Sequence, residues 1–240
     1  MKKILALMIM NVLLSSVAVA YESTYIFSDW EMNNFWEKVG KPQEKIFQVH
    51  TNLIMKNRFD KRVPVIVVQN KEVNAVTNKL DRKVQIYSGI LPLIENDDEL
   101  AFIIGHEMAH AVEVYNKGIL GVWITTFNSK TYEYKSDLKS IDYMVKAGYD
   151  PISAIIFANK FLGEPLTDWG FWNTHPKGSK RLIAMYKYIY KKYPQYLSSE
   201  KTQSPYYKNF EYMYAEQLKS FQHKEQIRQQ KQQAKRGADL

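Results

Sequence analysis

The pattern of apolar and polar residues predicts a mostly helical chain with one short region of β-strands. Segments with helical spacing or clear helix boundaries occur at residues 29–39, 43–57, 96–116, 129–148, 150–163, 179–192 and 204–223. β-branched or alternating runs occur at residues 64–68, 73–77 and 83–87. Strands grouped in one part of an otherwise helical chain predict an α+β fold with a small sheet.

Residues 96–112 carry the clearest helix signals. Asn96 is a good N-cap, acidic residues fill the first turn, and Glu99 occupies the capping-box position. We expect this helix to stop near Gly118, since glycine is a common helix terminator. Ile119–Phe127 is apolar but too short to span a membrane, and we expect it to pack in the core or to form a loop over a neighbouring site.

The first twenty residues predict a secretory signal peptide. Lys2 and Lys3 precede the short apolar run Ile4–Leu14, and Ala18–Ala20 has the A-x-A form of a cleavage site. We therefore expect a mature chain that begins at Tyr21 in the bacterial periplasm, with an uncleaved anchor as the alternative. No Cys follows the apolar run, so we do not expect a lipoprotein.

Composition adds limits to this picture. The chain has no Cys, which excludes disulfides, thiolate metal ligands and a Cys nucleophile. The formal net charge is +8, and residues 201–240 contain eight Lys/Arg against four Asp/Glu. This basic end, expected to be frayed from Gln222, is suited to an anionic membrane surface or an acidic partner, although such an end is more often a solvated extension. No nucleic-acid motif is present.

We divide the chain into a signal peptide (1–20), a globular domain (21–200) and a C-terminal helix with a Gln/Lys-rich tail (201–240).

Residues 106–110 read His-Glu-Met-Ala-His, an H-E-x-x-H pattern inside the well-capped helix. Residues four apart lie on one helix face, so His106 and His110 point the same way. Two imidazoles so placed can bind one zinc ion, and Glu107 can reach a water molecule beside it. We expect one Zn²⁺ per chain, with Glu107 as the general base of peptide hydrolysis.

A catalytic zinc site needs a third protein ligand. The spacing that supplies a third His would place it at position 116, which is Asn116. The acidic candidates further along are Glu113, Glu133, Asp137, Asp142 and Asp150. Glu113 is too close on the same helix to turn back onto the metal. Glu133 and Asp137 lie four apart, which suits a ligand Glu with an Asp that orients a ligand His, but two solvated acids beside neighbouring lysines explain the same spacing.

Several motifs together resemble the HtpX- and BepA-like zinc metallopeptidases, which are relatives of the CaaX prenyl protease. The segments that carry this resemblance are Asn74-Ala75, Gly89-Ile90-Leu91, Asp98-Glu99-Leu100-Ala101, Gly105 through His110, and Ala147-Gly148-Tyr149-Asp150-Pro151. The resemblance implies a zincin-like domain, mostly helical, with a small sheet beside the H-E-x-x-H helix. The sequence shows neither the membrane helices nor the tetratricopeptide array of such relatives, so we expect a stand-alone exported member.

The resemblance also implies roles for later residues. In that family a Glu-x-x-x-Asp on the second helix supplies the third ligand, which points to Glu133 with Asp137 beside it. A His-Pro followed by an Arg belongs to the same pattern and is matched by His175-Pro176 and Arg181. The resemblance implies that His175 approaches the metal or the reaction centre and that Arg181 supports the site.

Substrate preference is less defined than the metal site. Ser136 stands where Ala is usual in the family, and Ile141 stands where Gly is common. The strand around Asn74 and Ala75 is expected to pair with an extended substrate backbone, which predicts loose specificity suited to unfolded proteins.

Two functional hypotheses follow. The first is a zinc endopeptidase of the cell envelope that hydrolyses unfolded or misassembled proteins. In it, His175 or Arg181 stabilises the oxyanion, or His175 instead occupies the fourth zinc position and holds the enzyme latent. The second is a non-enzymatic periplasmic holdase or assembly factor with a mainly structural metal, contacting proteins through the aromatic segment 164–175 and the basic tail. Metal removal separates the two, because only the enzyme loses turnover.

Overall fold

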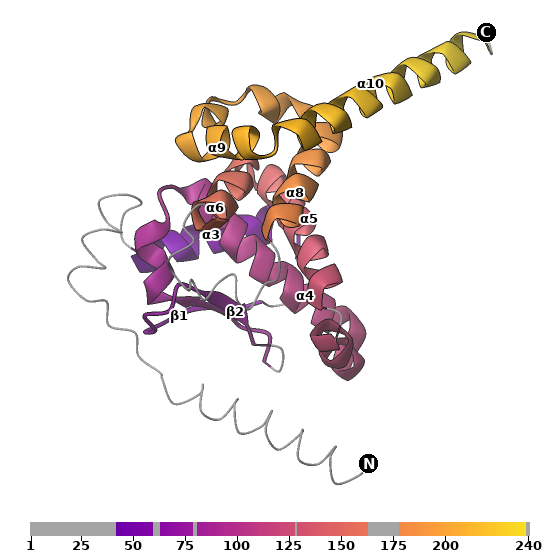
Figure 1. Ribbon diagram of the computed structural model, residues 1–240. Helices are drawn as coiled ribbons and strands as arrows, with labels where there is room; N and C mark the ends of the chain where they lie inside the picture. Colours follow the sequence, from indigo (N-terminus) through magenta and orange to yellow (C-terminus); the bar gives the residue numbers. More distant parts are fainter. Residues whose placement is uncertain (1–41, 60–62, 79–80, 128, 163–177, 239–240) are drawn as a thin grey trace.

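The computed structural model describes residues 42–59, 63–78, 81–127, 129–162 and 178–238. These residues form a mostly helical protein with one small sheet (Figure 1), which confirms the predicted α+β class. The predicted signal peptide, the predicted helix 29–39 and the loop that holds His175 lie outside the described residues.

Three short strands form the sheet: β1 (Val65–Val68), β2 (Ala75–Thr77) and β3 (Val84–Tyr87). Their order is β1-β3-β2, with β1 parallel and β2 antiparallel to the central strand β3. All three predicted strands are present, each a residue or two shorter than predicted. β2 is an edge strand whose strand partner, among the described residues, is β3.

Helices make up most of the remaining chain. They are α3 (Pro42–Asn57), α4 (Asp97–Phe127), α5 (Ser129–Ala147), α6 (Ile152–Leu162), α8 (Gly178–Lys192), α9 (Pro205–Met213) and α10 (Ala215–Ala238), with 3₁₀ turns η1 (Ser88–Leu93), η2 (Pro194–Ser198) and η3 (Glu200–Gln203). Figure 1 shows the sheet on one side of α3 and α4, and α9 and α10 on the opposite side of the molecule. Because α4 contacts α3, α5, α6, β2 and β3, it is the central element of the fold.

Side-chain caps fix the start of α4. Oδ1 of Asn96 accepts a hydrogen bond from the backbone N–H of Glu99 (3.1 Å), and Oε2 of Glu99 accepts one from the N–H of Glu95 (2.9 Å). The predicted N-cap is therefore confirmed. Lys160 on α6 donates to both carboxylate oxygens of Glu99 at 2.8 Å, so the capping residue also joins α4 to α6.

The predicted stop at Gly118 is wrong, because α4 continues without a break to Phe127. Ile119–Phe127 is helical and is not a loop. A glycine inside a helix costs only about 1 kcal/mol relative to Ala, which by itself is too little to end a helix. No proline follows Gly118 before the helix ends, so no residue there forces termination.

The end of α5 and the start of α6 follow the sequence signals. Gly148 comes directly after α5 and has a φ of +85°, which confirms it as the C′ residue in the left-handed region. Oδ1 of Asp150 accepts a hydrogen bond from the N–H of Ile152 (2.8 Å), as predicted for an N-cap.

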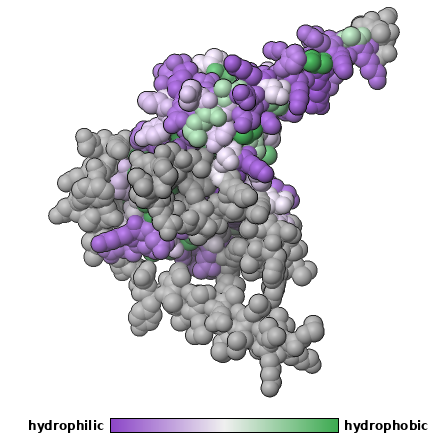
Figure 2. Space-filling view, viewed as in Figure 1, coloured by the Kyte–Doolittle hydropathy of each residue, from purple (hydrophilic) through white to green (hydrophobic). Residues whose placement is uncertain are grey.

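The C-terminal part of the chain differs from the prediction in two ways. The predicted helix 204–223 is two helices, α9 and α10, which meet at Tyr214. α10 then continues to Ala238 as a helix that projects from the body (Figure 1), where we expected a frayed tail from Gln222. Figure 2 shows this projection as mostly hydrophilic. Within the described ranges, no helix has the length and apolar character that crossing a membrane requires.

α4 and α5 approach each other closely at Gly105. A Cβ atom on Gly105 would lie 2.7 Å from Oγ of Ser140 on α5, closer than side chains tolerate. Oγ of Ser140 itself donates to the backbone O of Phe102 (2.8 Å), which joins the two helices at the same level. The glycine therefore sets the distance between the two helices that carry the predicted metal ligands.

We expect Gly105→Ala to lower the free energy of unfolding by about 1–3 kcal/mol, because the new methyl group overlaps Ser140 Oγ. Adding Ser140→Ala removes the overlapping oxygen and should recover part of this loss. Urea denaturation followed by circular dichroism measures both variants. Equal stability of Gly105→Ala and the wild type would contradict the proposed helix contact.

Candidate metal centre

The two histidines of the H-E-x-x-H pattern face a common point from α4. His106 has no exposed surface and His110 is 9% exposed, so both rings are buried. Their Nε2 atoms lie 3.1 Å apart. The capped, continuous helix thus places two nitrogen donors side by side, as the spacing predicts.

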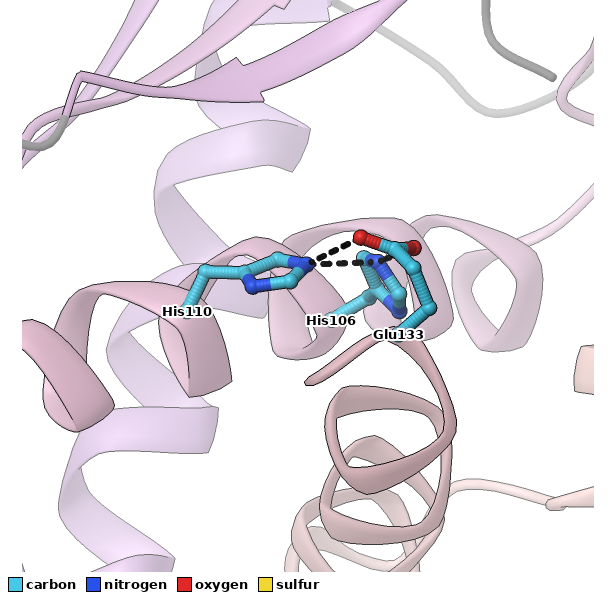
Figure 3. A group of neighbouring side chains, drawn as sticks. All are labelled: His106, His110 and Glu133. Carbon is cyan, nitrogen blue, oxygen red and sulfur yellow. Dashed lines mark hydrogen bonds and ion pairs between the residues drawn. The ribbon is translucent and has the colours of Figure 1, made fainter. Parts of the chain in front are cut away.

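Glu133 on α5 completes the group (Figure 3). Its Oε2 lies 3.3 Å from Nε2 of His106, and its Oε1 lies 3.2 Å from Nε2 of His110. With ligand bonds of 2.0–2.2 Å, donors around one tetrahedral zinc ion are separated by about 3.3–3.5 Å. The observed separations of 3.1–3.3 Å are close to that range, with each Nε2 facing a different oxygen of Glu133. His106, His110 and Glu133 therefore form a group that could hold one metal ion.

Both candidate ligand histidines are also oriented through their other ring nitrogen. Oδ1 of Asp137 lies 3.0 Å from Nδ1 of His106, and Oγ of Ser136 lies 3.2 Å from Nδ1 of His110. Hydrogen bonds at Nδ1 leave Nε2 available for a metal. Asp137 occupies the orienting position considered from its spacing. Ser136 was not predicted as a site residue, although its departure from the family's alanine was the available signal.

Arg181 lies behind the two acids of α5. Its Nε and Nη2 donate to the two oxygens of Asp137 at 2.7 and 2.6 Å, and its Nη1 lies 3.2 Å from Oε2 of Glu133. The guanidinium is fully buried. Burial would raise the pKa of Asp137, but the guanidinium holds that pKa below its usual range. This geometry gives Arg181 a supporting role for two carboxylates, and it does not place the residue as an oxyanion contact.

The charges around the group favour a divalent cation. When both histidines are neutral, the buried carboxylates of Glu107, Glu133 and Asp137 face the single buried guanidinium of Arg181, which leaves an excess of two negative charges. The same excess of negative charge affects the pKa of His106. Burial would lower the pKa of His106, but its contacts with Asp137 and Glu133 raise that pKa to about 9. Metal binding would displace this proton and supply the positive charge instead.

Glu107 lies beside the ligand group and is held by the sheet. Its side chain is 1% exposed. Oγ1 of Thr77, the last residue of β2, donates to Oε2 and to the backbone O of Glu107, each at 2.7 Å. Burial raises the pKa of the Glu107 carboxyl, as expected for a general base tuned toward neutral pH. Nothing in the sequence pattern singled out Thr77 as a partner of Glu107.

The remaining predicted site residues lie in different places. Asn74 and Ala75 are buried beside or in β2, and Oδ1 of Asn74 accepts from the N–H of Ala75 (3.0 Å). Any contact of these two with a substrate strand would therefore use the backbone. His175 lies outside the described residues. His50 is not part of the metal group: it is buried, and its Nε2 lies 2.7 Å from the backbone O of Val63.

Comparison with known proteins agrees with this geometry. Residues 41–116 match the model of peptidase family M48. The match includes the sheet and the H-E-x-x-H pattern but ends before α5, so it does not include Glu133. This part of the chain is therefore similar to the M48 peptidases.

A curated relative points the same way. The chain is 27% identical over 146 residues to the mitochondrial metalloendopeptidase OMA1 of Arabidopsis thaliana, which covers 49% of this chain and 30% of that protein. The chain thus spans less than a third of the length of that relative. The finer resemblance to HtpX- and BepA-like enzymes stays a prediction.

Proposed function

We propose that this protein is a zinc-dependent endopeptidase with a zincin-like domain that cuts unfolded or misassembled proteins of the bacterial cell envelope. The observation that carries the proposal is the spacing of the three donor atoms of His106, His110 and Glu133, which suits a tetrahedral zinc ion, with the buried Glu107 beside them. Two nitrogens and one carboxylate oxygen leave one tetrahedral position, as catalytic rather than structural zinc sites do.

In the proposed reaction, Glu107 carries out both proton transfers. When bound, the zinc ion supplies Lewis acidity, making a water molecule more acidic and polarising the scissile carbonyl. Glu107 takes a proton from the attacking water, whose oxygen bonds to the carbonyl carbon. Glu107 then gives that proton to the amine as the C–N bond breaks. Asp137 and Arg181 keep His106 and Glu133 in place throughout.

The edge strand β2 supplies a surface for an extended substrate. The O of Asn74 accepts from the N–H of Tyr87 (3.1 Å), and the N–H of Asn78 donates to the O of Lys83 (2.9 Å), so these backbone groups face β3. Because strand residues alternate, the backbone groups of Ala75 and Thr77 face away from β3, with the N–H of Ala75 bonded to Oδ1 of Asn74. Pairing through backbone groups reads little side-chain sequence, which supports a preference for unfolded chains.

The location and partners of the protein are further parts of the proposal. The signal-like residues 1–20 support export to the periplasm. Lys224, Arg228, Lys231 and Lys235 recur every three or four residues on α10, which puts them on one face of the projecting helix. Such a basic face suits an anionic membrane surface or an acidic partner. Cell fractionation of the full chain and of a chain ending at residue 223 tests both points.

Metal removal and replacement test the proposed activity. We expect residues 21–240 to contain one zinc ion and to cleave a labelled, unfolded casein. A chelator should abolish cleavage, and zinc, but not magnesium, should restore it. Zinc at about 100 times its dissociation constant should also stabilise the fold by about 2.7 kcal/mol, which thermal denaturation measures independently of turnover.

The same experiment addresses the alternative of a non-enzymatic holdase. A holdase would bind the unfolded protein and suppress its aggregation without producing fragments. Binding with no cleavage by the zinc-loaded protein would therefore support the holdase and contradict the peptidase.

A further inference from the structure

The hydroxyl of Thr77 connects the edge strand to the proposed general base. Thr77 ends β2, and Glu107 lies thirty residues later in the middle of α4. The hydroxyl lies 2.7 Å from two oxygens of Glu107, the carboxylate Oε2 and the backbone O. Both distances are typical of a hydroxyl donor, and a hydrogen bond to an ionised carboxylate is stronger than one between neutral groups.

This contact restricts the orientation of the Glu107 carboxylate. A threonine hydroxyl has one proton, so it can donate to Oε2, to the backbone O, or to both in a bifurcated bond. The two acceptors belong to the same residue, and the β-branched side chain of Thr77 has few rotamers. The side chain of Glu107 is thereby held at a fixed distance from its own backbone and from the strand.

The same residue faces the region where a substrate would pair. The backbone groups of Thr77 point toward the open edge of β2, whereas its side chain points toward α4. One residue thus contacts both the proposed substrate strand and the proposed base. We propose that Thr77 is a positioning residue that fixes Glu107 relative to a peptide paired with β2. This inference rests on the proposed peptidase function and adds to it a residue that sets the reaction geometry.

A purely structural role would also explain a hydrogen bond between strand and helix. Two substitutions separate the explanations. Thr77→Val keeps the shape of the side chain but removes the hydroxyl, and Thr77→Ser keeps the hydroxyl and removes a methyl group. Thr202→Val is a matched control, because the Oγ1 of Thr202 also donates to a backbone oxygen, that of Ser199, at 2.7 Å, and Thr202 is buried where Thr77 is half-buried. Thr202 lies on η3, which packs against α6 and α9, away from the metal group.

We expect Thr77→Val to lower kcat by about 10- to 100-fold, since a misplaced catalytic group costs rate more than binding. Its KM for an unfolded substrate and its zinc content should stay near those of the wild type. Thr77→Ser should restore kcat to within about threefold of the wild type, and Thr202→Val should leave kcat unchanged even where it lowers the melting temperature by a similar amount. Steady-state kinetics on a fluorogenic peptide, zinc analysis and thermal denaturation measure these quantities.

Three results would overturn the inference. They are an unchanged kcat in Thr77→Val, a failure of Thr77→Ser to restore it, and a loss in Thr202→Val as large as that in Thr77→Val. The Glu107→Gln variant, assayed alongside, keeps this inference separate from the proposed function. If Glu107→Gln is fully active, the peptidase mechanism itself fails. If Glu107→Gln is inactive and Thr77→Val is fully active, only the role of Thr77 fails.

Discussion

Glu107→Gln is expected to lower kcat by about 10²–10⁴-fold while the zinc content stays the same. Gln has nearly the same shape as Glu but cannot take a proton from water. Glu107 is 1% exposed, so no solvent-borne base has an easy route to replace it. The three candidate ligands are other residues, so the substitution leaves every ligand atom in place. Zinc analysis and cleavage of unfolded casein measure the two properties on one preparation.

A second glutamate on the same helix provides the control. Glu113 lies six residues further along α4 and is not one of the three grouped ligands. Glu113→Gln makes the same chemical change and should leave turnover within about twofold of the wild type. Full activity of Glu107→Gln would contradict the assignment of the base. Loss of zinc from Glu107→Gln would instead show that the residue contributes to metal binding.

The part of the site that lies on α4 could be predicted from the sequence for a local reason. Helical spacing alone places His106 and His110 on one face, and the cap at Asn96 fixes where the helix begins. The same kind of local signal failed at Gly118, because the tendency of glycine to end a helix is weak and the surrounding residues continue it.

The part of the site on other elements depends on packing that no local pattern contains. Spacing left Glu133 and Asp137 as either ligands or solvated acids. In the structure Glu133 is 5% and Asp137 1% exposed, which removes the solvated alternative. The deciding contact is with α4, where Gly105 and Ser140 permit the close approach of α5. Ser136 was marked only by its departure from the family's alanine, and Thr77 had no signal of its own, since a hydroxyl looks like any other polar residue until its partner is known.

Arg181→Met is expected to lower the free energy of unfolding of the metal-free protein by about 3–5 kcal/mol. The side chain of Arg181 is fully buried and contacts both Asp137 and Glu133. Met fills a similar volume but removes the guanidinium from two buried carboxylates. Removing one member of a buried pair costs far more than the pair contributes, because the remaining charge keeps its desolvation penalty. Urea denaturation in the presence of a chelator measures the effect without contributions from metal binding.

Two further variants serve as comparisons for Arg181→Met. They are Arg181→Lys and, in the exposed pair Lys208–Glu211, Lys208→Met. Lys keeps the positive charge but cannot bind both oxygens of Asp137 with a planar fork. The free energy of unfolding of Arg181→Lys should therefore lie between those of Arg181→Met and the wild type. Nζ of Lys208 lies 3.3 Å from Glu211 with both side chains largely in solvent, and Lys208→Met should cost at most about 1 kcal/mol. If Arg181→Met cost no more than Lys208→Met, the guanidinium would not be supporting Asp137 and Glu133. The expected order of stability places Arg181→Met lowest, Arg181→Lys next and the wild type highest. That order would mean that Arg181 stabilises Asp137 and Glu133.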